Sequence, residues 1–380
     1  MACLSNWVTD RLGQDMGGAA MLQAFLKLLA VSVGVGLAYI LIWPVPIDPV
    51  AWEAPENKGY SGDFSPNERL AGVRRIGLGA HVGPEDITFG PEGRLYIPTH
   101  DGAILRYDAV SGAVEEFAHT GGRPLGVEFD RDGTLFVADA YRGLLKVELS
   151  GEVTVLADTT VDGSSIDYAD DVDIGADGMV YFSDASVKFG AKANGGTLPA
   201  SLLDLMEHGP NGRVLKYDPA SGETSVLLDG LSFANGIALT ADGAHLLVVE
   251  TGTYSVLKLP VAGGEPTRIV ENLPGFPDNI NRNPDGTFWV GLVSPRSEAA
   301  DALSGKPFLR KVVQRLPASI RPKPQRYGFV LRIDETGKVL ETMQDPSGDY
   351  ALTTGMIEAE DGRRYVSSLT EPDLGVLAAD

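Results

Sequence analysis

One pattern recurs six times along the chain and leaves few folds open. Each copy has an apolar strand, a turn with Asp-Gly or a similar pair, a second apolar strand, a short connection and a third strand. The copies begin at Glu85, Leu125, Asp170, Asn235, Asp278 and Thr353. Where nothing is inserted they are spaced by about 40 residues, the repeat length of four-stranded propeller blades. The sequence therefore predicts an all-β fold, a six-bladed β-propeller.

The ends of the repeat array indicate how the ring closes. The sixth copy runs out after its third strand, at LGVLAAD, so its sheet lacks one strand. The segment VRRIGLG, residues 73–79, precedes the first copy and is the natural fourth strand of that sheet. Such closure removes a free sheet edge on which other chains could pair. We therefore expect the propeller to occupy residues 73–380.

Two copies are stretched by inserts, residues 187–210 and 294–327. Both inserts contain apolar residues at helical spacing, as in LLDLM and KPFLRKVVQRL. Inserts of this kind commonly lie on one face of a domain and cover a site. The alternative for the later insert is contact with a membrane. Its basic residues would then face lipid headgroups; they are Lys306, Arg310, Lys311 and Arg315.

An apolar stretch near the N-terminus, residues 21–43, predicts a transmembrane helix. About 20 residues at a rise of 1.5 Å each cross the bilayer core. Lys27 lies near its start, where it can snorkel, and Tyr39 and Trp43 lie at its far end, where amphipathic rings favour the interface. A cleaved signal peptide is the alternative, but its apolar region is usually about 7–15 residues and precedes a small-residue cleavage site, which this stretch lacks.

This anchor implies an order of domains and an orientation. Arg11 and Lys27 are the only basic residues before or within the span, and the next is Lys58. The positive-inside rule then places the N-terminus in the cytoplasm and the propeller on the periplasmic or lumenal side of a single-pass membrane protein. The segments before the propeller are an N-terminal cytoplasmic segment, the helix and a linker, at residues 1–20, 21–43 and 44–72.

The charge balance excludes one class of partner. The formal net charge is −21 at pH 7, and nucleic-acid affinity depends on Lys and Arg neutralising phosphates. We therefore expect no nucleic-acid partner. The excess of carboxylates has two explanations that are compatible: a solvated surface, and a site for a hard cation. The only cysteine, Cys3, precedes the apolar stretch and cannot form an internal disulfide.

Four polar residues, called the rim set below, occupy matching positions in four of the copies. They are Glu85, Asp170, Asn235 and Asp278, each at the start of an apolar innermost strand. Because these strands line the channel of a propeller, we expect the four side chains to converge at one rim. Three carboxylates this close repel one another unless protonated or neutralised, and an all-oxygen set without His or Cys favours Ca²⁺ over zinc or copper. The alternative is that they only cap strand ends or turns, but four matching positions favour a calcium site.

Other polar residues near these strands have less specific interpretations. Asn279, next to Asp278, is either a further ligand or a polar group on the strand. We expect His100 to pack or to form a turn. Asp139 and Asp184 end the second strands of successive copies, where a structural role is more common than a reactive one.

Several of these stretches resemble the strictosidine synthase-like branch of the calcium propellers, which includes gluconolactonases, paraoxonases and the adipocyte plasma membrane-associated group. The resemblance extends over roughly residues 66–377 and is strongest for the last group, where an N-terminal membrane helix is typical. The segments that carry it are GPEDI, GRPLGV, GRVLKYD, LLDGLSFANGIAL, VVETGTYSVLK, NLPGFPDNI and FWVGL.

The resemblance implies a central Ca²⁺ held by Glu85, Asn235 and Asp278. It also exposes three departures from the family pattern. Asp170 stands where the family usually has Asn, which adds a negative charge beside the metal. Paraoxonases have a His near the position of Leu125. Strictosidine synthase uses a Glu in the last blade, where the segment ALTTGMIE has Thr or Gly, so we do not expect Pictet-Spengler condensation.

The expected activity is calcium-dependent hydrolysis of a small hydrophobic lactone or ester, with Asp278 or Asp170 as the base that activates water. No G-x-S-x-G or H-E-x-x-H motif points to another hydrolase chemistry. No cofactor-binding residues are predicted other than the metal ligands. The alternative is a non-catalytic propeller that Ca²⁺ braces and that acts as a binding or scaffold protein, because a fold does not determine a function.

Overall fold

The computed structural model describes residues 3–379, with side chains from Ala20 onward. Its contacts divide the chain into two compact units. The anchor unit holds the chain up to Pro46 together with Phe308–Arg321, and the propeller unit holds Ile47–Pro307 and Pro322–Asp380. Part of the second insert is therefore grouped with the N-terminal helix.

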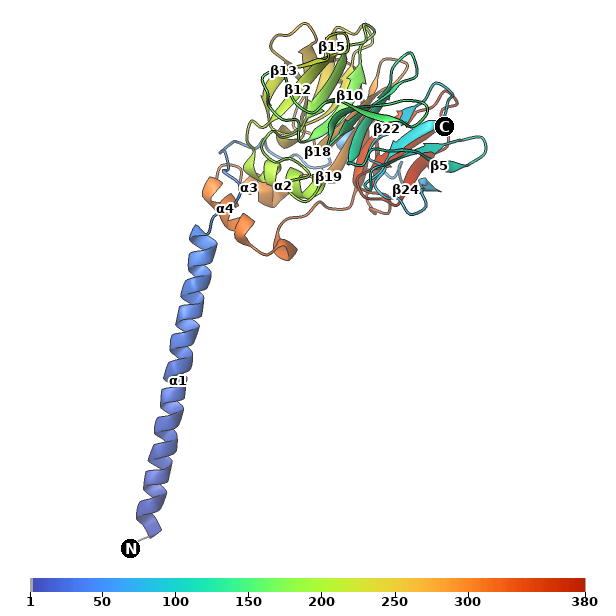
Figure 1. Cartoon of the computed structure of the whole chain (residues 1–380). Coiled ribbons are helices and arrows are strands. Elements are labelled where there is room, and N and C mark those ends of the chain that lie inside the picture. The colour runs from blue at the N-terminus through green and yellow to red at the C-terminus, as the bar shows by residue number, and fades with distance from the viewer. Residues whose placement is uncertain (1–2, 380) are drawn as a thin grey trace. The chain divides into compact units, whose positions relative to one another are not determined.

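The propeller unit contains six four-stranded antiparallel sheets, as the repeat pattern predicts (Figure 1). In five sheets the strands follow chain order from the innermost outward. The first two comprise β2 (Thr88–Phe89), β3 (Leu95–Pro98), β4 (Ala103–Tyr107) and β5 (Val114–His119), then β6 (Pro124–Phe129), β7 (Leu135–Asp139), β8 (Gly143–Val147) and β9 (Val153–Ala157). The third and fourth comprise β10 (Ala169–Ile174), β11 (Val180–Asp184), β12 (Gly212–Asp218) and β13 (Glu223–Leu231), then β14 (Ala234–Leu239), β15 (His245–Glu250), β16 (Ser255–Pro260) and β17 (Thr267–Val270). The fifth comprises β18 (Gly275–Arg282), β19 (Phe288–Pro295), β20 (Gly328–Ile333) and β21 (Val339–Asp345).

The sixth sheet closes the ring with a strand from the other end of the chain. Its C-terminal strands are β22 (Thr353–Glu358), β23 (Arg364–Ser368) and β24 (Asp373–Leu377), and its outermost strand is β1 (Arg74–Gly77). β1 pairs with β24 in antiparallel register, with Arg74 opposite Val376. The prediction that residues 73–79 supply the missing strand is confirmed.

The Asp-Gly turns join the inner two strands of the blades. Between β6 and β7, the Oδ1 of Asp130 accepts hydrogen bonds from the backbone N–H groups of Asp132 and Thr134, at 3.0 and 2.8 Å. Gly133 follows with φ of 84°, a conformation that costs a residue with a Cβ but not glycine. The short polar turn is what brings each strand back beside the previous one.

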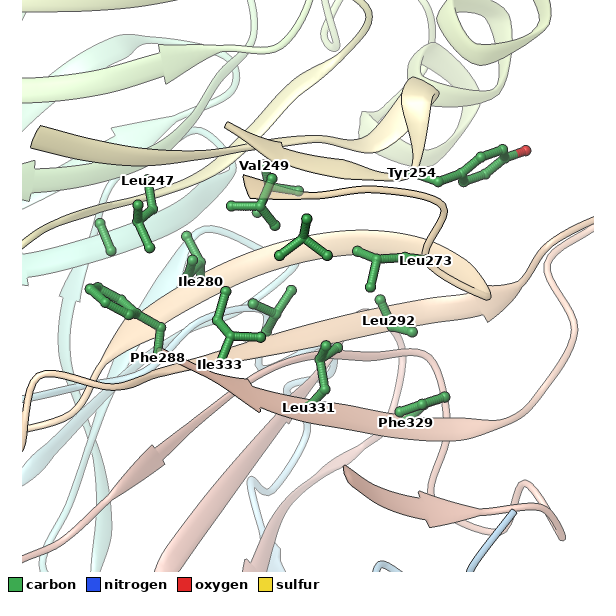
Figure 2. Close-up of a cluster of buried hydrophobic side chains, with 14 residues drawn as sticks. Leu247, Val249, Tyr254, Leu273, Ile280, Phe288, Leu292, Phe329, Leu331 and Ile333 are labelled. Carbon is green, nitrogen blue, oxygen red and sulfur yellow. The ribbon is translucent and has the colours of Figure 1, made fainter. Parts of the chain in front are cut away.

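The hydrophobic core lies between neighbouring blades. Figure 2 shows one cluster, in which side chains of β15 meet those of β18, β19 and β20. Leu247 and Val249 face the next blade's Ile280 and Phe288, and all four are buried. The strands are apolar on both faces because each sheet is covered by a blade on either side.

The inserts are helical, as their apolar spacing predicts. The first contains α2 (Thr197–Glu207), and the second contains α3 (Glu298–Ala302), α4 (Pro307–Arg315) and the short 3₁₀ turn η3 (Ala318–Ile320). Two more 3₁₀ turns, η1 (Gly62–Phe64) and η2 (Thr251–Thr253), lie in the chain before β1 and after β15.

The N-terminal helix α1 (Cys3–Ile42) is a single continuous helix. Its part from Ala20 to Ile42 is long and apolar enough to cross a membrane, and none of the most apolar window is buried. Arg315 of α4 donates from Nε to the carbonyl of Trp43 at 2.6 Å and from Nη1 to that of Ile40 at 3.1 Å. α4 therefore lies against the C-terminal end of α1.

Candidate functional site

The rim set lies at the beginning of four innermost strands and is buried. Glu85 precedes β2, and the other three lie within β10, β14 and β18. The exposed fractions are 2% for Glu85, 3% for Asp170, 4% for Asn235 and 7% for Asp278. The side chain of Asn235 donates a hydrogen bond to the carboxyl of Asp278. The charges of Asp278 and Asp170 act on Glu85, whose pKa they raise.

A repeated irregularity of the innermost strands positions these side chains. In β6, β10, β14, β18 and β22 the register with the second strand shifts after the first residues. Two consecutive residues in each strand are thereby left out of the ladder, and such bulges re-aim side chains. The unpaired residues are Leu125 and Gly126, Asp170 and Asp171, Asn235 and Gly236, Asp278 and Asn279, and Thr354 and Gly355.

The second residue of each pair alternates between polar and glycine around the ring. Glycine is required because the neighbouring polar residue approaches closely: an added Cβ on Gly126 would lie 2.5 Å from Cα of Asp171, and one on Gly236 would lie 2.6 Å from Cα of Asn279. Asp171 uses the space to accept a hydrogen bond from the backbone N–H of Ile237 at 2.7 Å. The glycines of alternate blades therefore allow the backbones of neighbouring innermost strands to approach closely.

Burial and mutual repulsion dominate the electrostatics of the rim set. Desolvation, followed by the charges of Asp278 and Asp170, raises the pKa of Glu85 well above its usual value. Desolvation and the charge of Asp278 likewise raise the pKa of Asp170. Burial raises the pKa of Asp278 to about 7, although its contact with Asn235 favours the ionised form. The site therefore favours neutral carboxyls unless a cation compensates their charge.

Three oxygens at this site are buried without a hydrogen-bond partner: Glu85 Oε2, Asn235 Oδ1 and Asn279 Oδ1. All belong to groups that accept but cannot donate at that atom when the carboxyl is ionised. Such atoms are costly to bury unless something binds them. The residues therefore fit a hard cation, although no three His, Cys, Asp or Glu side chains in the described part of the chain form a ready-made metal site. Within the rim set, the amide oxygen of Asn235 would have to contribute beside the carboxylates.

Asn279 also organises the backbone beside the rim set. Its Nδ2 donates to the carbonyl of Glu85 at 2.9 Å, and the hydroxyl of Thr354 donates to the same carbonyl at 2.5 Å. Thr354 lies at the position where the sequence suggested Thr or Gly. Its hydroxyl is thus committed to the backbone of the first blade.

Arg123 is a buried cation that the sequence did not identify. It precedes β6, is 3% exposed, and donates from Nη1 to the carbonyl of Pro124 at 2.9 Å, while Nη2 has no partner. Its charge interacts with Glu85 more strongly than with any other group and lowers the pKa of both Glu85 and Asp170. Burial in turn lowers the pKa of Arg123. It is therefore a buried positive charge that acts on the acidic residues of the rim set.

His100, Asp139 and Asp184 make structural contacts. His100 donates from Nε2 to the carbonyl of Leu369 at 2.6 Å, and burial and the charge of Arg123 lower its pKa to about 4. Asp139 accepts from the backbone N–H of Arg123 at 2.9 Å, and Asp184 accepts from that of Tyr168 at 3.1 Å. These second-strand acids therefore fix the segments that lead into the innermost strands.

The first insert is connected to the surroundings of the rim set. Tyr168, two residues before Asp170, donates from its hydroxyl to the carbonyl of Thr197 at 2.9 Å. Thr197 is the first residue of α2. The helix is therefore held beside the chain segment that positions Asp170.

Comparisons with known proteins agree with this architecture. The family described as strictosidine synthase matches residues 170–263, and the strictosidine synthase-like N-terminal family matches residues 62–107. Strictosidine synthase-like protein 10 of Arabidopsis thaliana is 35% identical over 83% of this chain and 92% of its own length. The chain belongs to the strictosidine synthase-like family. The adipocyte plasma membrane-associated protein of Salmo salar, also 35% identical over 87% of this chain and 83% of its own length, is a further relative.

Solved structures similar to this strictosidine synthase-like chain share its fold. A gluconolactonase from Xanthomonas campestris aligns with a TM-score of 0.59 and 16% identity, covering 88% of this chain and 97% of its own. A calcium-binding regucalcin from Agrobacterium tumefaciens aligns with a TM-score of 0.57 and 16% identity, covering 81% and 94%. At these identities the likeness concerns the propeller fold alone.

Proposed function

We propose that the chain is a membrane-anchored, calcium-dependent hydrolase of small hydrophobic lactones or esters. The observation that supports the proposal is that two residues of the rim set, Glu85 and Asn235, each have a buried acceptor oxygen without a hydrogen-bond partner. Structural neighbours described as a gluconolactonase and as a calcium-binding regucalcin support the same class of chemistry. Membrane anchoring would use the apolar part of α1, with residues 1–20 in the cytoplasm and the propeller in the periplasm or a lumen.

The metal ligands in this proposal are Glu85, Asp170, Asn235 and Asp278. A bound Ca²⁺ would polarise the carbonyl oxygen of the substrate. Asp278 would accept a proton from the attacking water, with Asp170 as the other possible base. Asn235 would hold the side chain of Asp278 in place. The hydroxyl of Thr354 and the amide of Asn279 would keep the backbone of Glu85 fixed.

The test measures acid release from a panel of aryl esters and lactones by the full-length protein, with and without a calcium chelator. We expect activity that chelation removes and Ca²⁺ restores. Asp278→Asn keeps an oxygen near the metal but removes the basic carboxylate, so its rate should fall by roughly 10²–10⁴ if that group is the base. Elemental analysis should still find calcium.

Glu85→Gln is the matched variant, since it alters a ligand that is not the proposed base. It should weaken calcium binding, so that its melting temperature falls at limiting Ca²⁺ and recovers when Ca²⁺ is added. A protein that holds stoichiometric zinc and no calcium would contradict the metal assignment. A panel without any calcium-dependent substrate would favour the binding or scaffold alternative.

A further inference from the structure

We propose that the second insert forms a collar, residues 306–323, that lies on the membrane surface where α1 leaves the bilayer and binds anionic lipid headgroups. The inference rests on the proposed anchoring by α1 and goes beyond it. It assigns a second membrane contact to a segment that lies more than 260 residues after the span in the sequence.

The first support is charge. The collar contains six basic residues and no acidic one, in a chain whose formal net charge is −21. Basic segments close to a membrane are attracted by anionic lipids. The collar is therefore a basic segment in an otherwise acidic chain, as binding to anionic headgroups requires.

The second support is position. The guanidinium of Arg315 bonds to the carbonyls of Ile40 and Trp43 in the last turn of α1. Tyr39 and Trp43, which are 44% and 59% exposed, mark the same end of the helix with rings that favour the interface. α4 is thereby held at the depth where the headgroups of a bilayer around α1 would lie (Figure 1).

The third support is the exposed apolar surface of the same segment. Phe308 is 55% exposed, Leu309 is 41% exposed and Ile320 is 64% exposed. Helices that lie in a membrane interface combine such apolar residues with a basic polar face. Phe308 and Leu309 of the nine-residue helix α4 and Ile320 of the turn that follows it supply the apolar part of such a surface.

The structure also determines which basic residues can reach headgroups. Arg310 and Arg315 are 3% and 8% exposed, and Arg315 is bonded to α1. The expectation that both face lipid is therefore wrong, because their side chains are enclosed by protein. Lys306 and Lys323, the first and last residues of the collar, are exposed and are the residues that we assign to headgroup binding.

The test uses the full chain in lipid nanodiscs and measures depth by spin labelling. Cys3→Ser removes the only native cysteine, and Phe308→Cys then carries a nitroxide. The matched control is Val110→Cys, at a residue of the propeller unit that is 98% exposed. The label at residue 308 should collide more with oxygen and less with a water-soluble nickel chelate than the label at 110. Ile320→Cys gives an independent probe of the collar.

Headgroup recognition is tested by comparing phosphatidylcholine discs with discs that also contain phosphatidylglycerol. The anionic lipid should move the label at residue 308 deeper. This shift should be lost when Lys306→Gln and Lys323→Gln are combined, and it should also be lost at high salt.

The outcomes separate the collar from the anchor. A protein that does not enter nanodiscs at all contradicts the anchoring and the collar together. A protein that enters, but whose labels at residues 308 and 320 are as accessible to nickel as the label at 110, overturns the collar alone. Equal depth in both lipid compositions overturns the binding of anionic headgroups.

Discussion

The two inserts look alike in sequence and have different environments in the structure. Each stretches one blade and contains a short helix with apolar residues at helical spacing. The first insert belongs wholly to the propeller unit, whereas α4 of the second is grouped with α1. The second insert has eight basic and two acidic residues, and the first has two of each.

The buried face of α2 is polar rather than apolar. Its buried residues are Thr197, Ala200, Asp204 and Glu207. Asp204 accepts hydrogen bonds from Ser186 at 2.6 Å and from Asn211 at 3.0 Å. Glu207 accepts from the side chain of Lys188, also at 2.6 Å. The comparison teaches that helical spacing predicts a helix but not the surface against which the helix packs.

The largest effect on the stability of the protein should come from Asp204→Ala in the first insert. The change leaves the buried donors of Ser186 and Asn211 without an acceptor, so we expect the free energy of unfolding to fall by about 2–4 kcal/mol. Urea unfolding of the full-length protein in detergent measures it. Leu202, in the same helix, is 39% exposed, so Leu202→Ala should lower the free energy of unfolding by less than about 1 kcal/mol. Equal losses would mean that the polar face does not attach α2.

The stability of the protein as a function of pH tests the polar attachment of α2 in a second way. Burial raises the pKa of Asp204 from 3.8 to about 7, so the folded state favours the neutral carboxyl. Its stabilising contribution is complete below the unfolded pKa and is lost as the pH rises through about 7. Relative to Asp204→Asn, the parent should lose at most about 1.4 kcal/mol of stability per pH unit in this window. Parallel stability curves for the two proteins would contradict the shift.

Arg315→Gln tests the joint between α4 and α1. A charged donor to backbone carbonyls contributes about 1.5–3 kcal/mol, so amide hydrogen exchange in residues 308–316 should accelerate by at least about tenfold, while unfolding of the propeller should not change. Arg131→Gln, at an exposed arginine outside the anchor unit, is the control. Unchanged exchange in the Arg315 variant would show that this joint does not order α4.

The smallest effect on the stability of the protein should come from Phe308→Ser in the second insert. Since the side chain is 55% exposed, removing it should alter the free energy of unfolding of the propeller by less than about 0.5 kcal/mol in detergent. The same urea titration as for Asp204→Ala measures it. A loss comparable to that of Asp204→Ala would place Phe308 in the core and remove the distinction between the inserts.

The fold could be predicted from the sequence because a propeller repeats a local pattern. Turn residues and strand lengths are encoded within each copy, and matching positions of the copies necessarily meet at the axis. This is why Glu85, Asp170, Asn235 and Asp278 could be grouped in advance. The alternation of polar residues with glycine next to them was equally readable, in pairs such as Asp170-Asp171 and Asn235-Gly236, but its meaning depends on the bulges.

Features that depend on long-range packing could not be predicted. Nothing in the sequence around Arg123 distinguishes a buried guanidinium from a surface one. The bond between Arg315 and the end of α1 joins residues 272 positions apart, and no local pattern encodes it. The polar buried face of α2 depends on Ser186 and Asn211, which lie outside the helix.

The closure of the ring by β1 also has a consequence for biosynthesis. Its partner β24 lies about 300 residues later, so β1 cannot pair until almost the whole chain has been synthesised. At about 5–20 residues per second this delay is roughly 15–60 s. During that time the blades can form by local pairing, but the nascent ring remains open. The ring can therefore fold as one cooperative unit only after Asp373–Leu377 leaves the ribosome. A chain whose synthesis ends shortly before this point would lack β24, the strand with which β1 pairs.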